Sequence, residues 1–182
     1  MLAVRELRRL ASSLSCEELE RQLGPFALVQ RPSQLALAEG PRSQSGAWQI
    51  PVITSPASRS AISEGVMSML FQFEELVVAT LPPLKGVVEL TVGRLPDCDL
   101  VIDDPSVSKR HAVLVWEQAS DMCLIRDLDS MNGTYLNDNE LFDETMLNDG
   151  DVISFGEAQF WYLRTATLHQ KMAQGPQVGR RG

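Results

Sequence analysis

Five polar side chains lie in predicted turns of the C-terminal half of the chain, and together they could bind an anion. They are Arg94, Ser108, Lys109, Ser130 and Asn132. Arginine can grip phosphate with a bidentate fork, and lysine adds a point charge. The hydroxyls add donors, and the amide of Asn132 has the donors and the acceptor needed to hold a peptide backbone. These residues therefore predict a phosphate carried by an extended peptide as the ligand.

The same region lacks the residue patterns of an enzyme or a metal centre. Ser108 and His111 could be read as a nucleophile and its base, but no third orienting group and no nucleophile elbow accompanies them. The three cysteines, Cys16, Cys98 and Cys123, are too far apart for a zinc site. We therefore expect a binding protein and not an enzyme, with no catalytic residue, no metal and no cofactor.

Short apolar runs separated by turn signals predict the elements that must position these side chains. The runs are residues 75–80, 87–92, 100–102, 111–116, 122–126, 152–155 and 159–163. Asn132-Gly133 and Asp149-Gly150 are typical of the turns between them. Short β-branched and aromatic strands with frequent turns favour an all-β sandwich or barrel. Loops at one end of a sandwich cluster in space, which would bring the polar side chains together.

Four motifs follow one another in this β region, and each alone would be a weak signal. They are Gly93-Arg94, Ser108-Lys109-Arg110-His111, Ser130-Met131-Asn132-Gly133-Thr134 and the segment 147–156, which reads L-N-D-G-D-V-I-S-F-G. With these motifs in this order, residues 69–166 resemble the forkhead-associated (FHA) domain. The resemblance implies a two-sheet antiparallel β-sandwich that reads phosphothreonine in partner proteins through loops at one end.

The resemblance also implies roles for individual residues of the site. Arg94 and Ser108 match the arginine and serine that contact the phosphate in the family, and Lys109 stands at a position that is often basic. Asn132 matches the asparagine that binds the peptide backbone beside the phosphothreonine. Four further residues are expected to support the site structurally: His111 by bracing the loop of Ser108, Gly93 by allowing a bend before Arg94, Gly133 by permitting its turn, and Thr134.

One residue departs from the family pattern. The position before the Asn-Gly pair is often serine or threonine and can contact phosphate, but here it is Met131, whose side chain cannot donate a hydrogen bond. Ser130 is the residue that could compensate. A hydrogen bond to a charged group contributes about 1.5–3 kcal/mol, so its loss would weaken binding roughly tenfold or more.

The rest of the chain divides into three further segments. Residues 1–29 are expected to be helical, because Val4, Leu7 and Ala11 form an apolar stripe and Ser15 and Glu18 form a capping-box pattern. The stripe either rests on another apolar surface of the chain or docks a partner helix. Residues 30–68 are rich in proline and serine and are expected to be a linker, and residues 167–182 a flexible tail.

Charge and hydropathy narrow the classes of partner. The formal net charge is −8 and the pI is about 4.8, so nucleic acid and anionic membrane surfaces are disfavoured. No run approaches the ~20 apolar residues that span a bilayer, so we expect no membrane insertion. An odd number of cysteines without a secretory signal is typical of reduced thiols, and we expect a cytoplasmic protein.

Three functions fit these observations. The first is an adaptor in Ser/Thr kinase signalling, which binds a phosphothreonine-containing protein that is either a Ser/Thr protein kinase or its substrate. The second is a structural subunit or scaffold of a protein assembly that uses the same sandwich without phosphate. The third is self-regulation, in which the site captures a phosphorylated residue of its own linker, with Thr54 as the candidate.

Overall fold

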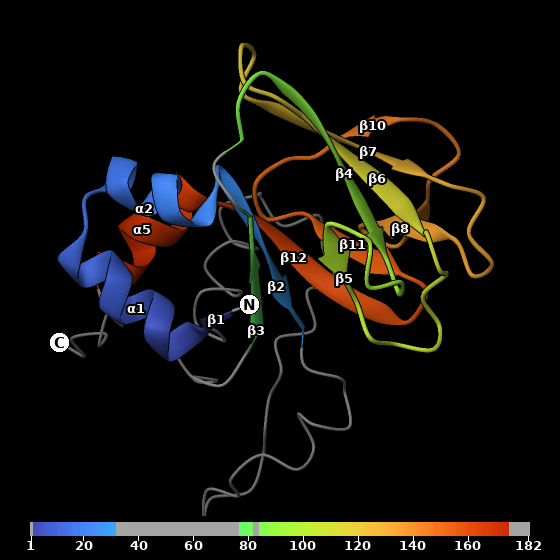
Figure 1. The fold of residues 1–182 in the computed structure, drawn as a ribbon, viewed down its shortest axis with the longest axis horizontal. Coiled ribbons are helices and arrows are strands. Elements are labelled where there is room, and N and C mark those ends of the chain that lie inside the picture. The colour runs from blue at the N-terminus through green and yellow to red at the C-terminus, as the bar shows by residue number, and fades with distance from the viewer. Residues whose placement is uncertain (1, 32–76, 82–83, 175–182) are drawn as a thin grey trace, which may run out of the picture.

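Two β-sheets packed face to face form the body of the protein (Figure 1). The computed structural model describes residues 2–31, 77–81 and 84–174. One sheet has the strand order β1-β3-β2-β12-β11-β8-β9, and the other has the order β10-β7-β6-β4-β5. All pairs among the described strands are antiparallel except β4 with β5. The predicted two-sheet sandwich is therefore confirmed.

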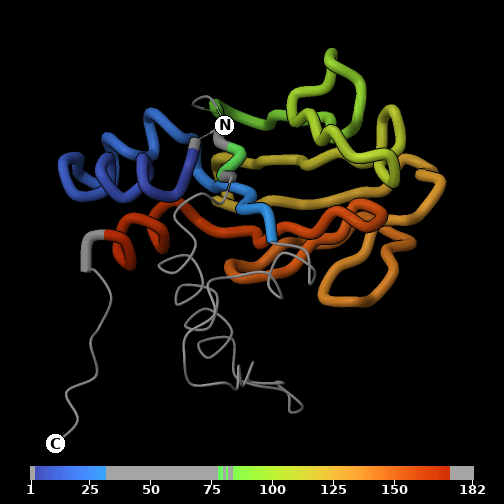
Figure 2. The backbone as a smooth tube through the Cα atoms, turned by 90° about the horizontal axis from the view of Figure 1, so that it is seen from below, coloured from blue at the N-terminus to red at the C-terminus, as the bar shows by residue number. Residues whose placement is uncertain are grey.

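The elements follow the chain in a simple order. The strands are β1 (Leu2–Ala3), β2 (Phe26–Gln30), β3 (Val77–Thr80), β4 (Val87–Gly93), β5 (Leu100–Val101), β6 (Ala112–Glu117), β7 (Met122–Asp127), β8 (Thr134–Leu136), β9 (Asn139–Glu140), β10 (Thr145–Met146), β11 (Val152–Phe155) and β12 (Ala158–Arg164). The helices are α1 (Val4–Ser13), α2 (Cys16–Leu23) and α5 (Thr165–Gln174). Figure 2 shows the helices grouped together at one side of the sandwich.

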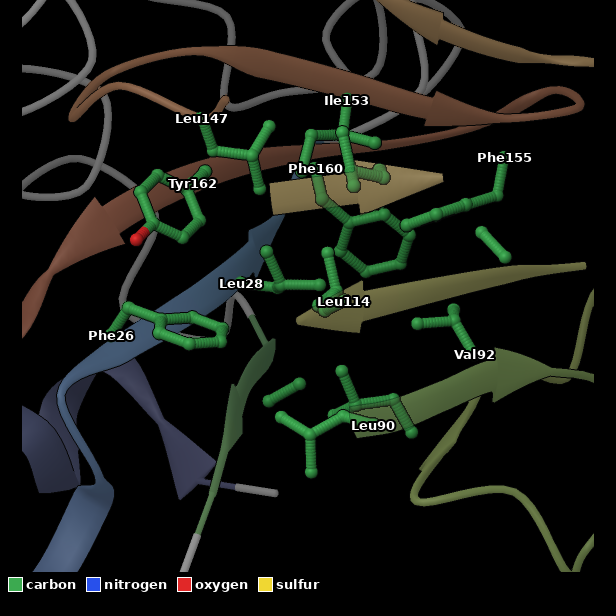
Figure 3. Close-up of a cluster of buried hydrophobic side chains, with 14 of the residues drawn as sticks. Phe26, Leu28, Leu90, Val92, Leu114, Leu147, Ile153, Phe155, Phe160 and Tyr162 are labelled. Atoms are coloured by element: carbon green, nitrogen blue, oxygen red, sulfur yellow. The ribbon is translucent and has the colours of Figure 1, made fainter. Parts of the chain in front are cut away.

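Strand β12 separates two hydrophobic cores, because successive side chains of a strand point to opposite faces. Phe160 and Tyr162 belong to the first core, which lies between the two sheets (Figure 3). Trp161 and Leu163 belong to the second core, on the outer face of the larger sheet. Both faces of the strand are therefore covered, and the run reads as continuously apolar.

Helices α1, α2 and α5 cover this outer face. Val4 and Leu7 of α1, Leu19 of α2, and Leu168 and Met172 of α5 are buried in the second core. The predicted capping box is present, since Ser15 Oγ accepts the N–H of Glu18 at 3.3 Å and the Glu18 carboxylate accepts the N–H of Ser15 at 2.9 Å. Since Val4, Leu7 and Ala11 are all buried in the second core, the apolar stripe of α1 rests on the protein's own sheet.

Two elements differ from the expectation. Residues 26–30 form strand β2 rather than part of a helical segment. Gly24-Pro25 ends α2, and the following side chains alternate between the cores, with Phe26 and Leu28 in the first and Ala27 and Val29 in the second. Helix α5 occupies residues 165–174, where a flexible tail was expected to start at residue 167. Its Leu168 and Met172 lie four residues apart and are buried.

Part of the expected organisation lies outside the described residues. The Pro/Ser-rich linker from residue 32 onward, its candidate Thr54, and residues 175–182 belong to this part. The domain boundaries at residues 29, 68 and 166 stay predictions. Within the described ranges, no helix is long and apolar enough to cross a membrane.

Strand β2 should be an integral part of the sandwich, and replacing Phe26 by alanine tests this. The ring is fully buried and packs against Trp116 of the opposite sheet and Tyr162 at centroid distances of 5.8 and 5.0 Å. Its removal should lower the free energy of unfolding by about 3–5 kcal/mol, measured by urea denaturation.

Phe142 is the matched control, because its side chain is 85% exposed. The Phe142→Ala change should alter the free energy of unfolding by less than about 0.5 kcal/mol. Equal effects of the two substitutions would contradict the placement of β2 in the core.

Candidate functional site

Three loops that carry predicted site residues meet at one end of the sandwich, opposite the turn between β6 and β7 (Figure 1). The backbone N–H of Arg94 donates to the carbonyl of Ser108 at 3.0 Å. The N–H of Met131 donates to Ser108 Oγ at 2.9 Å, and Asn132 Nδ2 donates to the carbonyl of Ser106 at 2.8 Å. The structure thus brings Arg94, Ser108 and Asn132 into one connected surface.

Ser108 is held by three hydrogen bonds and keeps its hydroxyl proton. Its N–H donates to His111 Nδ1 at 3.0 Å, its carbonyl accepts from Arg94, and its Oγ accepts from Met131. No described residue accepts the hydroxyl proton. The side chain is therefore fixed in place and still able to donate to an anion.

Two cationic side chains beside Ser108 have donor nitrogens that no described residue accepts from. Arg94 is exposed, and its Nε donates to the carbonyl of Val107 at 3.3 Å, which leaves both terminal nitrogens without an acceptor among the described residues. Lys109 is exposed and forms no ion pair within the described ranges. Arg110 differs, because its Nη2 lies 2.7 Å from a carboxylate oxygen of Asp97.

Gly93 is required by a close approach of two backbone segments rather than by a bend. A Cβ at this position would lie 2.4 Å from the carbonyl oxygen of Lys109 and 2.9 Å from Cα of Arg110. Its φ is not in the left-handed region. The absence of a side chain lets the end of β4 lie directly against the loop that carries Ser108 and Lys109.

His111 joins two of the loops from a fully buried position. Its Nδ1 accepts the N–H of Ser108, so Nε2 carries the proton and donates to the carbonyl of Gly133 at 3.1 Å. Burial lowers the pKa of His111, which favours this neutral form. Both ring nitrogens are occupied by backbone groups, so the ring is not placed to act as a base for Ser108 Oγ.

Asp127 organises the loop before Asn132. Its carboxylate accepts hydrogen bonds from Ser130 Oγ at 2.7 Å, Ser130 N–H at 2.9 Å and Thr134 Oγ1 at 2.5 Å. Burial raises the pKa of Asp127, but the hydrogen bonds from Thr134 and Ser130 outweigh it, and the pKa is lowered. The single hydroxyl proton of Ser130 is used on Asp127, so the structure does not bring it to the anion site as a donor.

Asn132 presents an acceptor to solvent. Its Nδ2 is engaged by Ser106, while its Oδ1 accepts no hydrogen bond from any described residue. Met131 is 89% exposed, so its thioether side chain lies in solvent while its backbone holds Ser108. The arrangement provides donors for an anion at Arg94, Ser108 and Lys109 and an acceptor for a peptide N–H at Asn132.

Ser106 is a site residue that sequence reasoning missed. It follows Asp104-Pro105, a combination that is typical of a turn closed by the aspartate side chain, and this signal could have identified it. In the part of the chain that the structure describes, no three His, Cys, Asp or Glu side chains are grouped to hold a metal ion.

Acidification should destabilise the protein through His111. Because burial lowers the pKa of the folded form below 6.5, the unfolded chain binds a proton at a higher pH than the folded protein does. The contribution of neutral His111 to the free energy of unfolding is therefore complete above pH 6.5. It is lost as the pH falls from 6.5 towards the lowered pKa of the folded protein. A proton on Nδ1 would also face the N–H of Ser108.

Urea denaturation of the wild type and of His111→Asn between about pH 8 and pH 5 measures this effect, since asparagine does not titrate there. The free energy of unfolding of the variant should fall less steeply with decreasing pH. Parallel pH profiles would show that His111 titrates alike in the folded and unfolded states.

Comparison with known proteins identifies a family for the region that carries these loops. Residues 90–156 match the family model of the FHA domain. The oxoglutarate dehydrogenase inhibitor of Corynebacterium jeikeium is 38% identical over 71 residues, which cover 39% of this chain and 47% of the relative. The transcriptional regulatory protein EmbR of Mycobacterium tuberculosis is 36% identical over 78 residues, which cover 43% of this chain and 20% of the relative. The chain thus spans between a fifth and about half of the length of these relatives.

Among solved structures, the FHA domain of FhaA, in complex with the intracellular domain of Rv3910, is 33% identical to this chain. The match covers 43% of this chain and 82% of that domain, with a TM-score of 0.40. The sequence identity over most of the FhaA domain and the match to the family model assign the region. The chain belongs to the FHA domain family.

Proposed function

We propose that this FHA domain binds phosphothreonine in a partner protein and acts as a phosphorylation-dependent adaptor. The observation that carries the proposal is the set of free polar groups at one end of the sandwich. Among the described residues, the hydroxyl proton of Ser108 and both terminal nitrogens of Arg94 have no acceptor, and Asn132 Oδ1 accepts no hydrogen bond and is open to a peptide N–H. A phosphate on an extended peptide would use all three at once.

Two related structures support this class of ligand. EmbR, whose solved chain is 33% identical to this one over the matched region, is described in complex with a low-affinity phosphopeptide. The structure of another FHA domain, 29% identical, is part of a study of phosphothreonine-dependent FHA domain interactions. The proposed partner is a phosphothreonine-containing protein, and a Ser/Thr kinase in the same cell would supply the phosphate.

The proposed compartment is the cytoplasm. Cys16, Cys98 and Cys123 are all free thiols in the structure, as is typical of a reducing compartment. The acidic net charge of −8 disfavours nucleic acid as a partner.

Replacing Arg94 by alanine should weaken phosphopeptide binding about tenfold or more, because a charge-assisted hydrogen bond to phosphate is lost. The measurement is binding of the full chain to a degenerate phosphothreonine peptide library, followed by isothermal titration with a selected peptide. The unphosphorylated library should not bind.

Arg9→Ala is the matched control, since Arg9 is an exposed arginine of helix α1. It should bind the selected peptide as the wild type does. If the wild type binds neither library at about 100 μM, a weak limit on the affinity scale, the adaptor function is wrong and the phosphate-independent scaffold takes its place.

Replacing Met131 by serine should strengthen phosphopeptide binding about tenfold, because a hydroxyl is added where the family often has one. The melting temperature should not change, since the methionine side chain is 89% exposed.

Met131→Ala separates the two effects of this substitution, because it removes the thioether without adding a donor. The alanine variant should bind with wild-type affinity. An equal gain for alanine and serine would show that the methionine obstructs the site and that the missing donor is not the cause.

A further inference from the structure

Ser106 connects three segments of the site, although among the described residues it forms no hydrogen bond with Ser108 Oγ or Arg94. Its Oγ donates to a carboxylate oxygen of Asp104 at 2.6 Å and accepts the N–H of Glu157 at 2.9 Å. Its carbonyl accepts Asn132 Nδ2 at 2.8 Å. One half-buried serine thus joins the loop 103–107, the turn after β11 and the loop of Asn132.

The contacts of Ser106 form a closed ring with two backbone groups. Gly156 N–H donates to the carbonyl of Gly133 at 3.1 Å, and Gly133 directly follows Asn132. A Cβ on Gly156 would lie 2.6 Å from the carbonyl oxygen of Ser106, so the turn is packed directly against the serine. We call Ser106, Asn132 and the turn 156–157 the Ser106 junction.

The junction determines which end of the Asn132 amide faces solvent. A side-chain amide presents donors at one end and an acceptor at the other, and a half rotation of the group exchanges them. Because Nδ2 is held by the carbonyl of Ser106, Oδ1 is the end left for a ligand. The Oγ bonds to Asp104 and Glu157 fix the position of that carbonyl.

We propose that Ser106 is a positioning residue for phosphopeptide recognition, which holds the Asn132 amide with its acceptor towards the peptide backbone. This role rests on the proposed phosphothreonine binding. Ser106 contributes no charge and does not touch the phosphate. Its hydroxyl acts through the fixed carbonyl and through Asn132.

The test compares the wild-type chain with three full-length variants in their affinity for the phosphothreonine peptide selected from the library. Ser106→Ala should weaken binding about three- to tenfold, the range that corresponds to one net hydrogen bond. Ser106→Thr keeps the hydroxyl and should retain most of the affinity. Ser120→Ala is the matched control, since Ser120 Oγ also donates to a carboxylate, that of Glu117 at 2.5 Å, at the opposite end of the sandwich.

A double-mutant cycle with Asn132→Ala distinguishes positioning from a general structural effect. If Ser106 acts through Asn132, the Ser106→Ala change should alter the affinity less than about twofold once Asn132 has been replaced. The full effect in both backgrounds, or no effect in either, would overturn the proposal. Thermal unfolding of each variant checks that it is folded.

Nuclear magnetic resonance of the Asn132 side-chain amide gives a second readout that does not depend on the peptide. The Ser106→Ala change should shift these amide resonances in the free protein, whereas Ser120→Ala should leave them in place. Unshifted resonances would overturn the junction itself. If Ser106→Ala shifts these resonances but the wild-type protein binds no phosphopeptide, the proposed function and the ligand role are overturned, while the junction stays intact.

Discussion

The geometry of the site depends on one buried neutral histidine. His111 accepts a backbone N–H from Ser108 at one ring nitrogen and donates to the carbonyl of Gly133 at the other. The ring meets Phe155 edge-on at a centroid distance of 5.6 Å, so the first core fixes the imidazole and the imidazole fixes two loops. A charged ring could not accept the N–H of Ser108. The unpaired positive charge at this end of the described structure therefore lies on Arg94 and Lys109, and the histidine supplies only position.

The sequence was most informative for strands with several β-branched or aromatic residues. Strands β4, β6 and β11 were predicted to within one residue at each end because each is a short apolar run bounded by turn residues. Strand β2 was missed because its short apolar run directly follows helix α2 and is separated along the chain from β3, the next described strand, by residues 31–76. The two-residue strands β9 and β10 have no periodicity to detect, and their pairing is set by their partners in the sheets.

Residue types in a recurring order were enough to predict which loops meet at one end of the sandwich, but not which protons are free there. Arg94, Ser108 and Asn132 do meet at one end of the sandwich, where the motif order placed them. Ser130 was a reasonable donor on its residue type, and only the direction of its hydroxyl, towards Asp127, removes it from that role. The need for Gly93 was visible in the sequence, whereas its cause, the carbonyl oxygen of Lys109 only 2.4 Å from where a Cβ would lie, was not.

The three serines around the site differ in one local feature that explains their different roles. Ser106 has an aspartate two residues before it and Ser130 has one three residues before it, and each donates its hydroxyl proton to that carboxylate. Short-range bonds of this kind are typical of turns closed by aspartate or serine side chains. Ser108 has Asp104 four residues before it, but among the described residues its hydroxyl donates to no carboxylate. Its Oγ instead accepts a backbone N–H from another loop, which directs the hydroxyl proton outward. The serine without a local carboxylate partner is therefore the one able to donate to a ligand.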